Sequence, residues 1–189
     1  MPGALRALGL LWLFCALAVG KLQLLTQVPP PVIPAIVLTL SGLLLLAYRI
    51  SDPLRSWLDG LDLRALVALH LTRFVGFYLL YLESHDRVPA VFFEAGAGDV
   101  VVALLALGVI LAPLPPAVRL RAITIWNVIG LVDILYVIAN AGRLAFSAPE
   151  GMREFMHLPL SLLPTLLVPL IIATHVIIFI RLGRERAGG

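Results

Sequence analysis

Six long apolar stretches, distributed over the whole chain of 189 residues, most restrict what it can fold into. A helix that crosses the hydrocarbon core of a bilayer needs about 20 mostly apolar residues. Charged residues make up 13% of the chain, whereas a soluble domain carries roughly 25%. The pattern predicts an all-α, polytopic transmembrane helix bundle, a single domain over residues 1–189, with spans at about 4–25, 32–50, 64–82, 90–112, 120–146 and 159–182.

Two segments between and within these stretches have further local signals. In "SDPLRSWLDGLDL", Ser51 or Asp52 is suited to cap a short helix. Three prolines interrupt backbone hydrogen bonding in the last stretch, so we expect them to bend that helix. They are Pro159, Pro164 and Pro169.

The first stretch has two interpretations. Arg6, the apolar run after it and "ALA" at residues 16–18 resemble a secretory signal peptide with its cleavage site. The five spans that follow favour a retained membrane anchor instead. Both interpretations stay open at the level of sequence.

The distribution of Arg and Lys predicts the orientation in the membrane. Cytoplasmic loops carry an excess of these residues, and six spans place both termini on one side. That side receives nine cations: Arg6, Arg49, Arg55, Arg64, Arg119, Arg121, Arg181, Arg184 and Arg186. The other receives four: Lys21, Arg87, Arg143 and Arg153. We therefore expect cytoplasmic termini.

Composition and motifs exclude several classes of function. The net charge of +3 comes from cations at the ends of apolar runs, without a basic tract, so nucleic acid is not an expected partner. The lone Cys15 excludes an intrachain disulfide and a CxxC site. The chain has no GxSxG, HExxH or P-loop motif, so nothing in it points to a particular enzyme class, and enzymatic activity stays undecided.

Polar residues inside the apolar spans are the candidates for function, because an unpaired ionisable group there costs several kcal/mol. His70 lies about 9 Å in from the cytoplasmic end of its span, one helical turn before Arg73. His175 lies at a matching depth in the last span. The full set of candidates is His70, Arg73, Asp99, Trp126, Asn127, Asp133, Asn140 and His175.

Three hypotheses use these residues differently. In the first, Arg73 forms a structural ion pair with Asp99 or Asp133, and the chain is a structural or accessory subunit of a membrane complex. In the second, His70 and His175 are the axial iron ligands of a b-type haem used for electron transfer. Arg73 then meets a propionate and Trp126 packs on the porphyrin.

The third hypothesis is a small proton- or ion-coupled transporter. Ionisable residues in spans often serve proton relays and transport. His70, Arg73, Asp99, Asp133 and His175 would line a polar pocket, with Asn127 and Asn140 as further members. The acidic character of "EAGAGDV" favours a cation or a proton over an anion.

Several short motifs resemble a loose family of uncharacterised bacterial polytopic membrane proteins. They are "HLTR", Gly98-Asp99, "WNVIG", an outer "SAP" and the proline-rich last span with His175, within residues 64–182. Gly98, Gly76 and Phe77 depart from the family's common Asn, bulkier residue and Glu at these positions. The resemblance implies about six helices in a bacterial inner membrane, and no function. Beyond lipid, a membrane-protein partner or a second copy stays open.

Overall fold

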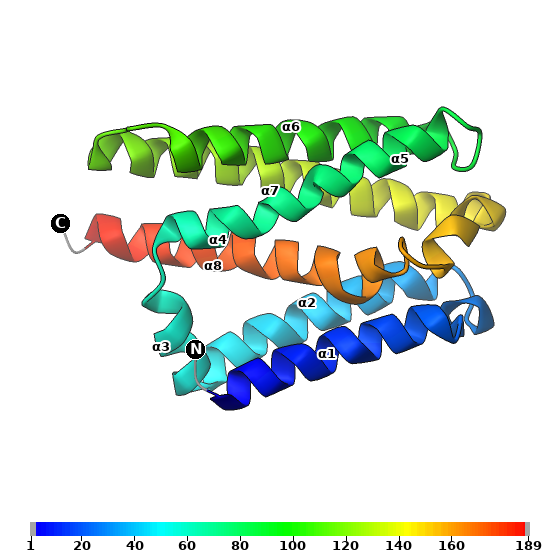
Figure 1. Ribbon diagram of the computed structural model, residues 1–189, viewed down its shortest axis with the longest axis horizontal. Coiled ribbons are helices and arrows are strands. Elements are labelled where there is room, and N and C mark those ends of the chain that lie inside the picture. The colour runs from blue at the N-terminus through cyan, green and yellow to red at the C-terminus, as the bar shows by residue number, and fades with distance from the viewer. Residues whose placement is uncertain (1–2, 188–189) are drawn as a thin grey trace. The chain divides into compact units, whose positions relative to one another are not determined.

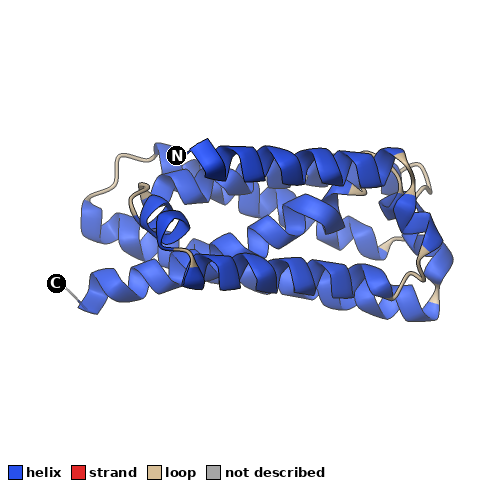
Figure 2. Ribbon diagram, turned by 90° about the horizontal axis from the view of Figure 1, so that it is seen from below, coloured by secondary structure: helices blue, strands red, loops and turns tan. Residues whose placement is uncertain are grey.

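The computed structural model describes residues 3–187 and is all-helical, with no strand among them (Figures 1 and 2). Its elements are α1 (Gly3–Lys21), η1 (Leu24–Gln27), α2 (Val32–Ile50), α3 (Asp52–Asp59), α4 (Leu63–Leu69), η2 (His70–Val75), α5 (Gly76–Glu83), α6 (Val91–Leu111), α7 (Pro116–Ser147), η3 (Pro149–Met156), η4 (Leu163–Leu167) and α8 (Val168–Ala187). Here η1, η2 and η3 are 3-10 helices and η4 is one π-helical turn.

Six helical segments of the described chain are long and apolar enough to cross a membrane, which is the number that the sequence predicts. The second span is predicted to the residue, and the third, fourth and fifth to within about one turn. The first helix ends earlier than expected, at Lys21, and the last begins later, at Leu163. Both differences occur where polar or proline-rich residues favour turns.

The contacts of the chain divide it into two compact units. Unit 1 comprises residues 1–60 and 138–173, and unit 2 comprises residues 61–137 and 174–189. Both α7 and α8 continue from one unit into the other along the chain. The expectation of a single transmembrane domain stays a prediction, and each unit is described by itself below.

Within unit 2, the broken helix α4–η2–α5 packs against α6 along its length. Two glycines allow the backbones to approach closely. A Cβ atom on Gly96 would lie 2.9 Å from the carbonyl oxygen of Gly76, and one on Gly76 would meet the carbonyl of Gly96. Close backbone approach through small residues is a typical way of packing helices in membranes. It brings η2 against the part of α6 that carries Asp99.

Unit 1 contains α1, α2 and the π-helical turn η4, which contacts both. The turn lies at Pro164, which agrees with the expected distortion of this helix by proline. The indole Nε1 of Trp12 donates to the carbonyl oxygen of Thr165 at 2.9 Å, and the Thr165 hydroxyl donates to the carbonyl of Ser161 at 2.7 Å. At α3, Ser51 is the N-cap, and its Oγ accepts from the amide of Leu54.

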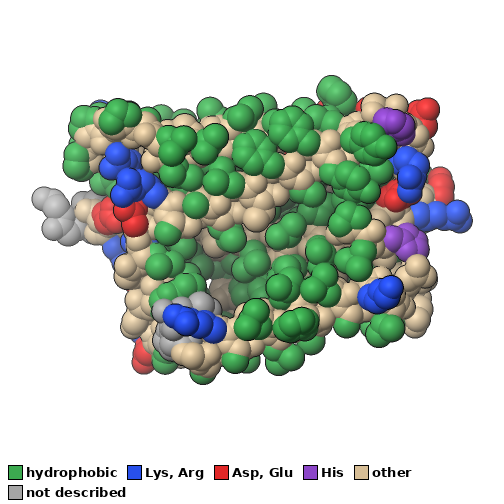
Figure 3. Space-filling model, in the orientation of Figure 1, with side chains coloured by type: hydrophobic (Ala, Val, Ile, Leu, Met, Phe, Trp, Pro, Cys, Tyr) green, Lys and Arg blue, Asp and Glu red, His purple; other side chains and the backbone are tan. Residues whose placement is uncertain are grey.

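Side chains on the surface follow the pattern of a membrane protein. Figure 3 shows hydrophobic side chains over the lengths of the helices and charged side chains gathered toward helix ends. Leu11 and Phe14 on α1 and Val132 on α7 are among the exposed large apolar residues. Such surfaces are expected where the solvent is lipid, because no hydrophobic effect drives these groups inward there.

Candidate ion site

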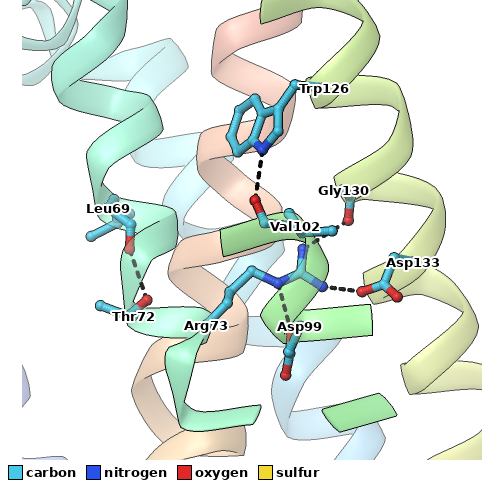
Figure 4. A network of polar contacts seen from close by, with 8 residues as sticks. All are labelled: Leu69, Thr72, Arg73, Asp99, Val102, Trp126, Gly130 and Asp133. Carbon is cyan, nitrogen blue, oxygen red and sulfur yellow. Dashed lines mark hydrogen bonds and ion pairs between the residues drawn. The ribbon is translucent and has the colours of Figure 1, made fainter. Parts of the chain in front are cut away.

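A buried arginine on η2 is the centre of the polar cluster in unit 2. Arg73 is completely buried, and its guanidinium has three protein partners. Nε donates to a carboxylate oxygen of Asp99 at 2.6 Å, Nη1 donates to the carbonyl oxygen of Gly130 at 3.0 Å, and Nη2 forms an ion pair with Asp133. Figure 4 shows the guanidinium between the two carboxylates, one from α6 and one from α7. The expected pairing of Arg73 with an acid is thus present, with both acids instead of one.

Local backbone features place these groups. Arg73 lies in η2, where the span is wound as a 3-10 helix between two α-helical halves. Such a departure from α-helix within a span often marks a functional hinge or a strained sequence. On α6 and α7, glycines make room: a Cβ on Gly98 would run into the Asp133 carboxylate. A side chain at Gly98 would therefore push Asp133 away from Arg73.

Two histidines lie beside each other next to this ion cluster. His70 and His175 are both fully buried, and their ring centroids are 4.2 Å apart. The Nε2 atom of His70 bonds to the hydroxyl of Thr174 at 3.1 Å, and Nδ1 of His175 bonds to Oδ1 of Asn127 at 2.7 Å. The expected juxtaposition of the two imidazoles is therefore present.

Each imidazole keeps one buried nitrogen without a partner among the described residues: Nδ1 of His70 and Nε2 of His175. Asn127 defines the state of His175. Its Nδ2 donates to the backbone carbonyl of His175 at 3.0 Å, so its Oδ1 faces the ring and can only accept. Nδ1 of His175 therefore carries the hydrogen, and Nε2 of the neutral ring presents a lone pair. It can accept a proton.

Trp126 packs against both imidazoles. Its indole lies edge-on to His70, with ring centroids 4.8 Å apart, and its Nε1 donates to the carbonyl oxygen of Val102 at 3.0 Å (Figure 4). Its ring lies at a centroid distance of 5.4 Å from that of His175. Trp126 thus packs against the two imidazoles that were expected to flank a porphyrin.

The geometry of the two histidines does not fit a bis-histidine haem. Each iron–nitrogen bond measures about 2 Å and each ring centre lies about 1 Å further out, so axial imidazole centroids are roughly 6 Å apart. The observed rings are 4.2 Å apart and tilted by 51°. Arg73, expected to meet a propionate, has both carboxylates as partners. We therefore derive no step through haem.

The site also does not have the ligand set of a metal centre. No group of three or more His, Cys, Asp and Glu side chains within residues 3–187 could hold a metal ion. His70 and His175 provide two nitrogens, whereas a structural zinc site takes four ligands.

Most of the residues expected in the site are together in unit 2, with one exception. Asn140 belongs to unit 1, and its side-chain oxygen accepts from Arg143 at 3.3 Å in an exposed position. The seven-residue spacing places Trp126, Asp133 and Asn140 on one stripe of α7, but the compact units divide that stripe. Nothing in the sequence marks where one unit ends along a continuous helix.

The glycines are contributors that sequence reasoning missed. Besides Gly98, a Cβ on Gly130 would lie 2.6 Å from Cε1 of His175, and its carbonyl accepts from Arg73. A signal for it exists in hindsight. Asn127, Gly130 and Asp133 are spaced by three residues along α7, so they lie near one face.

Comparison with known families gives one match and no activity. Residues 30–183 match the family described as Domain of unknown function (DUF8737). The comparison with curated proteins found no match, and neither did the comparison with solved structures. The match covers all candidate residues and most of the chain, so the chain belongs to the DUF8737 family.

Proposed function

We propose that this protein is a small integral membrane protein that binds and passes protons, most simply as a proton-coupled transporter. The observation that carries the proposal is the sharing of one guanidinium by two carboxylates. If Arg73, Asp99 and Asp133 are all ionised, the group has a net charge of −1 in a buried setting. An uncompensated charge inside a membrane is costly, and one added proton neutralises the cluster.

The differing exposure of the two acids supports a route for this proton. The side chain of Asp133 is 19% exposed and that of Asp99 is 10% exposed, while Arg73 is sealed. Asp133 is therefore the better entry point. Because Arg73 can stay paired with either carboxylate, the proton can reside on one acid or the other without leaving the arginine unpaired. A cluster with two such arrangements is suited to couple proton binding to transport.

The imidazole pair supports a continuation of the route. Nε2 of His175 and Nδ1 of His70 have no hydrogen-bond partner among the described residues. Nε2 of His175 also lies beside Gly130, whose carbonyl accepts from Arg73. Histidine changes its charge near neutral pH and often serves as a proton shuttle. The ion cluster and the two imidazoles thus form one group of potential proton carriers inside unit 2.

The proposal includes a location. Six apolar helices are compatible with a multi-pass membrane protein, and the resemblance noted above favours a bacterial inner membrane. The excess of cations on the side of the termini favours cytoplasmic termini. Accessibility of cysteines introduced at the two ends of α6, tested in intact and lysed cells, checks the orientation independently of any activity.

Proton movement tests the proposal directly. The protein is reconstituted in liposomes that hold a pH-sensitive dye. A membrane potential that is negative inside is then imposed with a potassium gradient and valinomycin. We expect proton entry above that of empty liposomes, and its loss in Asp133→Asn and Asp99→Asn, because either change leaves a neutral Arg–Asp pair without the second carboxylate that takes up the proton. Glu94→Gln is the matched control: Glu94 is an exposed acid on α6 whose contact with Tyr136 an amide can keep.

A second measurement detects proton binding itself, so it tests the proposal even when the transported solute is absent. Infrared difference spectroscopy between acidic and neutral pH reports the stretching band of a protonated carboxyl group. We expect a band that disappears in Asp133→Asn or Asp99→Asn and persists in Glu94→Gln. The absence of both proton entry and this infrared band would overturn the proposal and leave the structural ion pair as the explanation. A Soret band lost in both His70→Ala and His175→Ala would instead support haem.

A further inference from the structure

Unit 1 has a chain of three adjoining pockets that the proton cluster does not use. The first, of about 430 Å³, lies between the α1–α2 connection and η3, and its lining includes Thr26, Val28, Glu150, Arg153 and His157. The two segments meet there, because η1 contacts η3. This pocket therefore lies at the ends of the apolar helices of unit 1, where polar headgroups are found in a membrane.

The other two pockets are apolar and extend along the helices. One, of about 360 Å³, shares Val28 with the polar pocket and also has Val19 and Ile36 in its lining. The next, of about 200 Å³, shares Trp12 and Leu40 with it. The shared residues join a polar end to an apolar groove between α1 and α2.

The polar end has charges that match a phospholipid headgroup. Arg153 in η3 and His157 directly after it supply hydrogen-bond donors, and neither side chain bonds to another residue in the described part of the chain. Arginine is well suited to bind phosphate oxygens. Glu150 adds a carboxylate to the same pocket, which complements an ammonium group beside that phosphate.

The apolar groove extends over most of the depth of one leaflet. From Ile36 to Leu44, which line its two ends on α2, a helix rises about 12 Å. One leaflet is half of a hydrocarbon core about 30 Å thick, or about 15 Å. A lipid whose phosphate lies at Arg153 can therefore place one chain along this groove without leaving its own leaflet.

We propose that unit 1 binds one glycerophospholipid with an amine-bearing headgroup, phosphatidylethanolamine being the simplest. Arg153 and His157 bind the phosphodiester, Glu150 binds the ammonium group, and one acyl chain lies along the Trp12–Leu40 groove. This site is separate from the proposed proton function, since every residue of it belongs to unit 1.

Delipidation and addition of defined lipids test the site. The delipidated protein in detergent is titrated with phosphatidylethanolamine, phosphatidylcholine, phosphatidylglycerol or inorganic phosphate, while the thermal midpoint is recorded and bound lipid is counted by native mass spectrometry. We expect one tightly held phosphatidylethanolamine and a higher thermal midpoint. Arg153→Gln should weaken binding by about tenfold or more, the usual effect of losing a charge-assisted hydrogen bond. Glu150→Gln should reduce the preference for the amine.

Two matched controls separate a specific site from general adhesion. Lys21→Gln removes a cation at the end of α1 that lines none of the three pockets, and Leu38→Phe enlarges an exposed residue of α2 outside them. Both should leave binding unchanged, whereas Leu40→Phe should fill the groove and weaken it. The proposal would be overturned if Arg153→Gln and Lys21→Gln weakened binding equally, which would point to ordinary surrounding lipid. It would also be overturned if phosphatidylglycerol bound as well as phosphatidylethanolamine, or if inorganic phosphate raised the thermal midpoint as much.

Discussion

The two compact units satisfy their buried polar groups in different ways. In unit 2, the polar groups are charged: one guanidinium holds two carboxylates, and two imidazoles lie next to it. In unit 1, several polar bonds run from side chains to backbone, as in Trp12 to Thr165, Thr165 to Ser161 and Ser41 to Val37. The buried Tyr48 is an exception, because its hydroxyl donates to the Asp59 carboxylate. Both units consist of apolar helices of similar kind.

This difference bears on the role that we propose for the charges of unit 2. In unit 1, several hydrogen bonds join a neutral side chain to a backbone carbonyl, and such bonds cost little to bury. A buried ion pair is weak support for stability, because its desolvation penalty can exceed the Coulombic gain. Stability alone therefore does not account for the ionic cluster, in line with the proton-binding role that we propose. Four predictions test this contrast.

The largest effect should come from removing the cation of unit 2. Arg73→Met leaves Asp99 and Asp133 buried without a partner, and we expect a loss of about 3–5 kcal/mol in the free energy of unfolding. Denaturant titration in micelles measures it. The control in unit 1 is Arg55→Met, which breaks an exposed ion pair with Asp52 and should cost at most about 1 kcal/mol. Adding Asp99→Asn and Asp133→Asn to Arg73→Met should recover most of the loss. Equal costs for the two arginines would end the contrast between the units.

A smaller effect should follow from adding a methyl group beside the imidazoles. The Cβ of Gly130→Ala would lie 2.6 Å from Cε1 of His175, so the ring must shift, at a cost of about 1–3 kcal/mol. In unit 1, Gly42 on α2 has no neighbour within 4 Å of that position. Gly42→Ala should therefore stabilise the helix by about 0.5–1 kcal/mol. The sign of the two changes in thermal midpoint is the readout, and the same sign in both would contradict the packing described around His175.

The neutral network of unit 1 should respond only modestly. Trp12→Phe removes the indole N–H that bonds to the carbonyl of Thr165, and we expect a loss of about 1 kcal/mol. Trp126→Phe is the matched change in unit 2, where the indole also donates to a backbone carbonyl. The free energies of unfolding should fall by similar amounts, while proton entry changes only in Trp126→Phe, whose ring contacts both imidazoles. A change of proton entry in Trp12→Phe would show that unit 1 takes part in the proton route.

The smallest effect concerns the capping carboxylate of α4. The side chain and backbone of Arg64 donate to Asp62, which holds the pKa of that carboxyl below its ordinary value of 3.8. A lowered folded-state pKa gives stability that is present above pH 3.8 and is lost as the pH falls through the folded-state value. Asp62→Asn should therefore lower the thermal midpoint slightly at neutral pH, where the ionised carboxylate contributes, and the difference should shrink as the pH falls through the folded-state pKa. A difference that is as large at acidic pH as at neutral pH would contradict the assignment.

The sequence determined the helical architecture and the membership of most of the site. Helix formation and approximate span ends follow from local apolar runs, prolines and caps, and Ser51 caps its helix as expected. The depth of His70 and His175 along their spans was enough to predict that they could meet, because rise per residue is fixed. The requirement that a buried Arg73 find an acid came from the cost of an unpaired charge.

Tertiary structure alone decided how these groups combine. Whether Arg73 pairs with Asp99, with Asp133 or with both depends on three helices meeting at one point, and on glycines at 98 and 130 that leave room there. The 4.2 Å separation of the imidazoles, which does not fit a haem, depends on helix rotation. So does the assignment of Asn140 to the other unit. Periodicity places a residue on its helix, but the rotation and approach of helices arise from contacts distant in sequence, which no local pattern encodes.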